Sequence, residues 1–186
     1  MAMAIFKPAE VNDQQLDWII LRDGGVQLYW RDEILSDDLR WLKSNGYKII
    51  FFDAAEWRSG SEWESQRRMH ESLKDKLSFP DYYGENLDAL DECIVDDLVV
   101  PDNGGLALVL NHYDHLSKPI AEMVLNIFAR AVRHHLLFGR RLLLLVQSDD
   151  PTIQFESLGG IAAGWNSRMA EQEPRFVDRL TEFWSA

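Results

Sequence analysis

Carboxylate side chains are concentrated in the middle of the chain, in a segment that contains no lysine or arginine. Between residues 77 and 117 the acids are Asp81, Glu85, Asp88, Asp91, Glu92, Asp96, Asp97, Asp102 and Asp114. These nine account for most of the net charge of −12. Ionised carboxylates accept strong charge-assisted hydrogen bonds from arginine and lysine. Their chemistry here is therefore the binding of a cationic surface.

A helix predicted over residues 85–95 separates these acids from the apolar residues beside them. At 100° per residue, one side collects Leu87, Leu90, Cys93 and Ile94. The other side collects only acids, which are Glu85, Asp88, Asp91, Glu92 and Asp96. Like charges one turn apart destabilise a helix by a few tenths of a kcal/mol per pair. A solvated face of an acidic protein is one interpretation. The single sign of the charge favours the other, a row of carboxylates that imitates RNA phosphates and fills the basic cleft of a nuclease.

The run PDYYGENLDAL, residues 80–90, leads into this helix, and Cys93 follows three residues later. This run resembles the signature of the barstar family, which are intracellular protein inhibitors of secreted ribonucleases similar to barnase. The resemblance extends more weakly over about residues 48–148. It implies an α/β fold with a three-stranded parallel sheet and packed helices.

The resemblance also implies a partner-binding surface. Tyr82, Asn86, Asp88 and Glu92 take positions in it, with Glu92 at the place of the phosphate-mimicking aspartate. Asp91 and Asp96, on the same acidic face, complete the predicted set of partner-binding residues. We expect a basic, ribonuclease-type protein partner and neither catalysis, a bound metal nor a cofactor. Tyr83 is expected to pack in the core.

Three departures from the family pattern bear on the choice of partner. Asp91 stands where barstar has a tryptophan, and Asp96-Asp97 stand in place of a Gly-Trp pair. Arg130 falls where the last helix of the family carries an interfacial acid. Exchanging an aromatic residue for an acid removes contact area and adds charge. We therefore expect this surface to depend more on electrostatics, with a partner that need not be a close relative of barnase.

Two other functions are compatible with the sequence. His112, Asp114 and His115 follow an expected strand and could serve a metal-dependent hydrolase, although this spacing on a loop is a weak signal. An acidic scaffold without inhibitory action is the third hypothesis. His134-His135 at the end of a helix are explained by the helix dipole. Cys93, on the apolar face, is expected to be buried, with a raised pKa and a structural role.

The predicted elements alternate between strands and helices. Continuous apolar runs at residues 48–52, 106–110 and 142–146 predict strands covered on both faces. Helical patterns lie between them at residues 61–77 and 85–95, and between Ile120 and Ala131. Strands joined through helices pair in parallel. The middle section is therefore expected to be a parallel sheet with the order β-α-α-β-α-β.

The two ends of the chain are predicted from local signals. Apolar runs at 18–21 and 26–30 flank Asp23-Gly24-Gly25, which predicts a β-hairpin. A helix is then expected to start at Ser36 as its N-cap, with Asp37 and Asp38 in its first turn, and to stop at Gly46. A C-terminal helix is expected to carry Phe176, Val177, Leu180 and Trp184. The glycines between 159 and 164 are interpreted as a turn or as a place of close packing.

The composition indicates a globular protein made of one compact unit. We divide it into an N-terminal hairpin-helix extension over residues 1–46, a barstar-like domain over 47–149 and a C-terminal extension over 150–186. The negative charge disfavours direct binding to nucleic acid. The lone Cys93 indicates a reducing compartment, and no apolar run reaches the roughly 18 residues of a membrane span. We therefore expect a cytoplasmic protein that binds no membrane.

Overall fold

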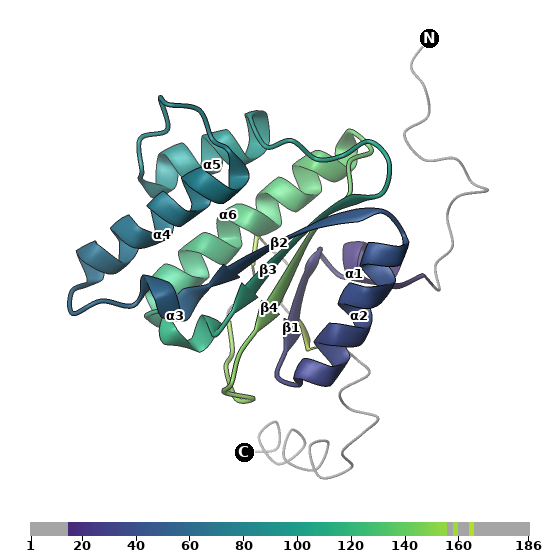
Figure 1. Cartoon of the computed structure of the whole chain (residues 1–186), viewed down its shortest axis with the longest axis horizontal. Helices are drawn as coiled ribbons and strands as arrows, with labels where there is room; N and C mark the ends of the chain where they lie inside the picture. The colour runs from purple at the N-terminus through teal and green to yellow at the C-terminus, as the bar shows by residue number, and fades with distance from the viewer. Residues whose placement is uncertain (1–14, 156–157, 160–163, 166–186) are drawn as a thin grey trace.

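A parallel β-sheet forms the centre of the protein (Figure 1). The computed structural model describes residues 15–155, 158–159 and 164–165. Its strand order is β2-β3-β4-β1-β5, and every neighbouring pair is parallel. Four of these strands are four to seven residues long, and β5 contributes only Gly164–Trp165.

The three strands expected in the middle of the chain are confirmed. They are β2 at Tyr47–Asp53, β3 at Gly105–Asn111 and β4 at Leu142–Gln147. Strands β3 and β4 are buried almost throughout, as their continuous apolar runs predict. Strand β2 lies at the edge of the sheet, and the side chain of Phe51 is 49% exposed. Coverage of β2 on both faces was therefore a wrong expectation, because an apolar run does not reveal the position of a strand in the sheet.

The predicted N-terminal hairpin is wrong. The first apolar run forms helix α1, Leu16–Arg22, and the second forms strand β1, Val26–Tyr29. The backbone amide of Gly25 donates to the carbonyl of Ile20 at 2.7 Å, so the two glycines end a helix. Gly24 and Gly25 have φ values of 103° and 76°, which serve a helix end as well as a hairpin turn.

Strand β1 enlarges the sheet beyond the predicted three strands. It pairs with β4, with Val26 opposite Leu144, and on its other side it pairs with β5. The expectation of a three-stranded sheet is therefore wrong. A turn signal such as Asp23-Gly24-Gly25 describes only a local reversal, whereas the actual partner of β1 lies more than a hundred residues away.

Helix α2, Asp32–Ser44, begins five residues before the start that an N-cap at Ser36 implies. Ser36 is inside the helix, and the N-cap is Arg31, whose side chain makes no capping hydrogen bond. The first turn contains Asp32 and Glu33, which interact favourably with the positive end of the helix dipole. The predicted N-cap at Ser36 is thus wrong, because an acidic first turn replaces a side-chain cap.

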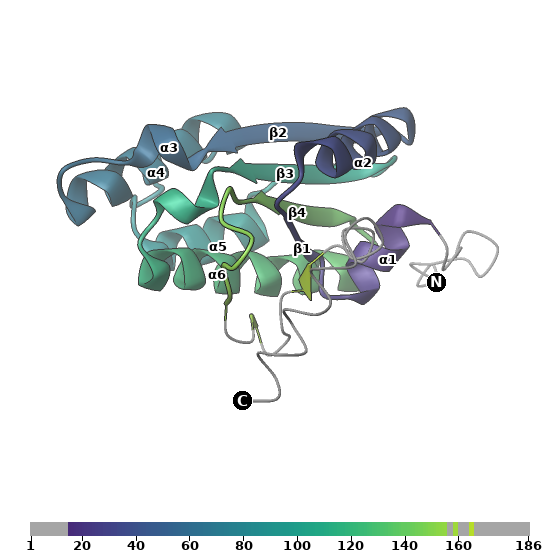
Figure 2. The ribbon, with the colours of Figure 1, turned by 90° about the horizontal axis from the view of Figure 1, so that it is seen from below.

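Four further helices lie between the strands, together with the short 3-10 helix η2, Tyr113–His115. Helix α3, Ala54–Trp57, was not expected. The other three were expected and are α4, Glu62–Leu77; α5, Leu87–Asp96; and α6, Lys118–Leu137. Helix α6 packs on β4 and β1, and α5 packs on α6 (Figure 2). Helix α5 is therefore the outer element of this side, with one face left open to solvent.

A buried carboxylate ties the N-terminal elements to the sheet. Asp17 of α1 is 1% exposed. It accepts hydrogen bonds from the hydroxyl of Tyr47 at 2.8 Å and from Arg141 Nη1 at 3.1 Å. Tyr47 begins β2 and Arg141 precedes β4, so one side chain connects three separate parts of the chain.

The predicted C-terminal helix lies outside the described residues, as does part of the glycine-rich stretch before it. Among the residues that the structure does describe, no helix combines the length and the apolar character that crossing a membrane requires.

Candidate functional site

Asn86 fixes the loop at the start of the acidic helix α5 by hydrogen bonds to residues before and after it. Asn86 caps the helix by accepting a hydrogen bond from the amide of Ala89 at 2.9 Å, and its Nδ2 donates to the carbonyl of Gly84 at 3.1 Å. Glu85, just before the cap, has a φ of 51°, which non-glycine residues rarely adopt. Asn86 therefore has a structural task in addition to its predicted place in the binding surface.

The apolar face of α5 is buried as its periodicity predicts. Leu90, Cys93 and Ile94 are at most 2% exposed. The Nε2 atom of His135 in α6 donates to the carbonyl of Ile94 at 2.8 Å, which fixes the two helices together. Burial, followed by the nearby Asp97, raises the pKa of the Cys93 thiol to about 11. The expected structural role of Cys93 fits this environment.

Three carboxylates of α5 form an open acidic row, which we define as Asp88, Glu92 and Asp96. All three are exposed, and none makes a hydrogen bond or ion pair with another residue in the described part of the chain. The last turn of α5 contains no basic residue. The expectation that Asp88 and Glu92 are exposed in the free protein is confirmed. The row is available for binding without any unfolding.

Asp91, the fourth acid predicted for this surface, is engaged within the protein. Arg130 Nη2 of α6 lies 2.7 Å from Asp91 Oδ2, and the Asp91 side chain is 27% exposed. The pair joins α5 to α6 through two residues that lie 39 positions apart in sequence. The expected face of acids alone is thus interrupted by a neutralising arginine, which helical periodicity within α5 does not reveal.

Tyr82 lies on the surface next to the acidic row. Its side chain is 70% exposed, and its hydroxyl lies 2.8 Å from both carboxylate oxygens of Asp97. This hydrogen bond is the main reason why the pKa of Tyr82 is raised to about 12. Tyr82 is therefore held in one orientation, with most of its ring exposed.

Tyr83, by contrast, is buried, as expected. It packs against Phe79 with ring centroids 5.0 Å apart, and its hydroxyl bonds to Nδ1 of His70 in α4. Burial lowers the pKa of His70 to about 4, so this histidine is neutral near pH 7. The buried pair anchors the loop that carries Tyr82 and Asn86.

The histidine cluster differs from the one that the sequence suggested. His112 Nδ1 lies 2.8 Å from Asp53 Oδ1, and this hydrogen bond is the main reason why the pKa of His112 is raised. Ligand-type atoms of Asp114, His115 and Asp149 lie within 4.8 Å of one another. Asp149 thus takes the place that sequence reasoning gave to His112. The shared edge formed by the carboxyl ends of parallel strands is the signal that could have identified Asp53 and Asp149.

His135 also corrects an expectation. It is fully buried, and burial lowers its pKa, so the neutral ring donates to Ile94 instead of acting as an imidazolium at the helix end. The helix dipole therefore does not explain both histidines of the His134-His135 pair.

A groove that sequence reasoning missed lies next to the acidic row. It has a volume of about 650 Å³ and separates α4 from the start of α5. Its walls are Trp63, Gln66, Arg67 and His70 on one side and residues 85–88 on the other. Asn86 and Asp88 belong both to this groove and to the predicted binding surface.

Comparison with known proteins identifies the same region. Residues 58–147 match the family model described as "Barstar (barnase inhibitor)". Within curated proteins, the chain is 46% identical over 55 residues to the "Putative ribonuclease inhibitor YrdF" of Bacillus subtilis (strain 168). That match covers 30% of this chain and 56% of the relative, so the chain spans little more than half of the relative's length.

A solved structure described as "Structure of Drosophila ORC bound to AT-rich DNA and Cdc6" is also similar to part of the chain. The two are 18% identical, and the match covers 72% of this chain and 43% of that one, with a TM-score of 0.42.

Proposed function

We propose, from the premise that residues 58–147 place this chain in the barstar family, that the protein inhibits a basic ribonuclease by occupying its active site. The open acidic row of α5 takes the place of RNA phosphates in the cationic cleft. Inhibition follows from occlusion alone, and the protein itself needs no catalytic residue, metal or cofactor.

The observation that carries this proposal is the exposure of Asp88, Glu92 and Asp96 without partners in the described structure. Each neighbouring pair is four residues apart, so the carboxylates repel one another along one helix face. This arrangement costs stability in the free protein, by about a few tenths of a kcal/mol per pair. A cationic partner removes the repulsion and replaces it with charge-assisted hydrogen bonds.

The acidic row also favours rapid association. Like-signed charges on one exposed helix attract a basic protein over distances of about a Debye length, which is about 8 Å at physiological ionic strength. The buried face of α5 fixes the helix on α6, so the carboxylates do not have to be ordered on binding. We therefore assign both steering and contact to the same three side chains.

An inhibitor of this kind protects the RNA of the cell that contains it. We accordingly place the protein in the cytoplasm, as an antitoxin or immunity-type partner of a ribonuclease. The partner contacts include Tyr82 and Asn86 beside the acidic row, as the family resemblance implies. Asp91 contributes less, because Arg130 already neutralises it.

A metal-dependent hydrolase is the rival from another functional class. It would use Asp114, His115 and Asp149, which are half-buried or exposed and lie together at the carboxyl edge of the sheet. In that case the acidic row of α5 would have no part in the activity. A chelator separates the two hypotheses, because occlusion of a nuclease does not depend on a bound metal.

The test uses the full chain as bait. The purified protein is immobilised to capture basic proteins from its native host, and each captured protein is assayed for ribonuclease activity with and without the inhibitor. We expect stoichiometric inhibition of a captured ribonuclease that persists in EDTA. A captured ribonuclease that remains fully active would indicate the scaffold hypothesis, and capture of no ribonuclease would refute the proposal.

A further inference from the structure

The groove between α4 and the start of α5 lies next to the acidic row and is lined by side chains of both helices. Its volume of about 650 Å³ is large enough for a long side chain. Asp88 lines it from α5, and Trp63 lines it from the first turn of α4. The groove therefore places an aromatic ring and a carboxylate on the walls of the same hollow.

Trp63 is available for binding. Its side chain is 71% exposed, and its ring makes no aromatic or cation–π contact with any residue that the structure describes. Most other tryptophans in the described chain are buried or partly buried, with Trp57 only 2% exposed. A large exposed aromatic residue beside a proposed interface is the type of side chain that commonly dominates binding energy.

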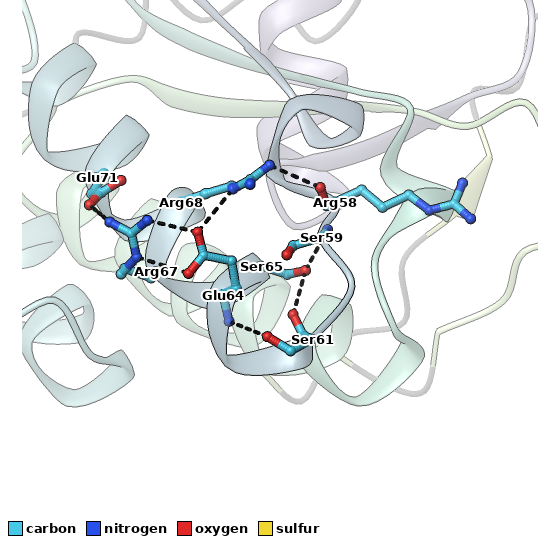
Figure 3. A network of polar contacts seen from close by, with 8 residues as sticks. All are labelled: Arg58, Ser59, Ser61, Glu64, Ser65, Arg67, Arg68 and Glu71. Carbon is cyan, nitrogen blue, oxygen red and sulfur yellow. Dashed lines mark hydrogen bonds and ion pairs between the residues drawn. The ribbon is translucent and has the colours of Figure 1, made fainter.

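The backbone under Trp63 is held by a network of polar contacts at the start of α4 (Figure 3). Ser61 Oγ caps the helix by accepting from the amide of Glu64 at 3.2 Å. Ser65 Oγ donates to the carbonyl of Ser61 and accepts from the amide of Ser59, both at 3.0 Å. Binding at Trp63 therefore requires ordering of a side chain but not of the backbone.

The same network neutralises the arginine that lines the groove. Arg67 is paired with Glu64 at 2.7 Å and also with Glu71 one turn further along α4 (Figure 3). On the opposite wall, Glu85 lies 3.5 Å from Lys74, whereas Asp88 has no partner in the described chain. The charge left without a counterion in the groove is the carboxylate of Asp88.

We propose that this groove binds an arginine side chain of the ribonuclease, with the guanidinium stacked on Trp63 and paired with Asp88. The proposal rests on the proposed function and adds α4 to the interface. An acidic side chain would be repelled by Asp88. A guanidinium is planar and weakly hydrated, so it suits an aromatic face better than the compact ammonium of lysine.

The groove can be tested without the nuclease. The probe is the peptide acetyl-Gly-Arg-Gly-amide, and its neutral control contains citrulline, which keeps a similar shape without the charge. The indole N–H signal of Trp63 is assigned by its loss in Trp63→Phe. We expect this signal to shift saturably with the arginine peptide at millimolar concentrations, with at least threefold weaker binding to Asp88→Asn. An equal response to citrulline, or no response to arginine, would refute the site.

A kinetic test then measures the groove in the complex. Trp63→Ala should speed dissociation from the captured ribonuclease by about 2- to 30-fold, the range of a cation–π contact. Phe138→Ala is the control, because Phe138 is also an exposed aromatic residue, at 60%, but lies outside the groove at the end of α6. Dissociation that is unaffected by Trp63→Ala, with inhibition retained, would reject the groove while leaving the proposed function intact. If no ribonuclease is bound, the proposed function fails and the peptide titration still decides the groove.

Discussion

Two buried acids of the N-terminal elements and the open acidic row of α5 have opposite relations to the rest of the protein. Asp17 and Asp38 are each 1% exposed, and tyrosine hydroxyls donate to both, from Tyr47 and Tyr29 respectively. Asp88 and Glu92 are exposed and have no partner in the described chain. The first group stabilises the fold, whereas the second is left free to bind. A carboxylate that is paired within the chain stabilises the fold, whereas a carboxylate without such a partner is available to bind another protein.

The largest effect is expected for Glu92→Ala in the complex. We expect it to weaken ribonuclease binding by about 2 to 5 kcal/mol, because truncation leaves cationic side chains of the cleft buried and unpaired. The barnase–barstar complex, formed by a member of the barstar family, is one of the complexes in which this cost of truncating a buried charge has been measured. Asp88→Ala should cost somewhat less. Surface plasmon resonance with the captured ribonuclease should show the loss mainly as faster dissociation.

The stability of the Glu92 variant provides its control. Circular dichroism and thermal unfolding should show a folded protein at least as stable as the wild type, because one repulsive pair on each side has been removed. Unchanged dissociation of a folded Glu92→Ala variant would show that the binding mode of the family does not apply to this chain.

Asp17→Ala is expected to lower the stability of the protein without changing its binding. Removing this carboxylate leaves the hydroxyl of Tyr47 and the guanidinium of Arg141 without their acceptor, so unfolding free energy should fall by about 2 to 3 kcal/mol. Urea denaturation measures this loss. Binding to the ribonuclease should be unchanged where the variant is folded. A large loss of affinity with little loss of stability would contradict the division between the two groups of acids.

Acid should destabilise the fold through His70 as the pH falls below neutral. The unfolded histidine takes up a proton near pH 6.5, whereas burial lowers the pKa of the folded His70 to about 4. Between these values the unfolded state binds more protons, so this contribution to stability is present above pH 6.5 and is lost as the pH falls towards 4. We expect a loss of about 1 to 2 kcal/mol, after allowance for solvent screening.

Comparison with His70→Gln isolates this contribution. His135 acts in the same direction because burial lowers its pKa, and His112 acts in the opposite direction because Asp53 raises its pKa. Denaturation at pH 4.5 and pH 7 should therefore show a smaller difference in stability for His70→Gln than for the wild type. Equal differences would exclude His70 as a source of the pH dependence.

The smallest effects are expected at the edge of the surface, and they should have opposite signs. Asp96→Asn should slow association by a few fold, because it removes one charge from the row that steers a basic partner. Arg130→Gln should speed association, because it releases the carboxylate of Asp91 from its ion pair. Association rates at two salt concentrations measure both, and both differences should shrink at the higher salt. Slower association of Arg130→Gln would indicate that this arginine meets an acid of the partner.

The acidic face of α5 could be predicted because it depends on a period of 3.6 residues within one helix. Asp88 and Glu92 on one side and Cys93 on the other needed no information from elsewhere in the chain. The three middle strands were predictable for a similar reason, since each is a continuous apolar run. Sequence periodicity was sufficient for features that depend only on residues close together in the chain.

The features that were missed depend on contacts between distant segments. Arg130 reaches Asp91 across 39 residues, and Asp149 joins Asp114 and His115 only because β3 and β4 are neighbours. The helix α1 was mistaken for a strand because a four-residue apolar run and two glycines fit both structures. Trp63 gave no signal at all, since an aromatic residue near the start of a helix is usually part of a core.

The position of β1 determines when the protein can finish folding during synthesis. Among the strands that the structure describes, β1 is the first to leave the ribosome, yet its neighbours in the sheet are β4 and β5, the last two of these strands. At about 5 to 20 residues per second, β1 remains without its neighbours for several seconds to some tens of seconds. Helix α5 is complete well before β4 is made, so the acidic row is translated before the sheet that supports it can close. Nascent chains released before β4 should therefore display β1 as an unpaired strand, a target for chaperones or for pairing with other chains.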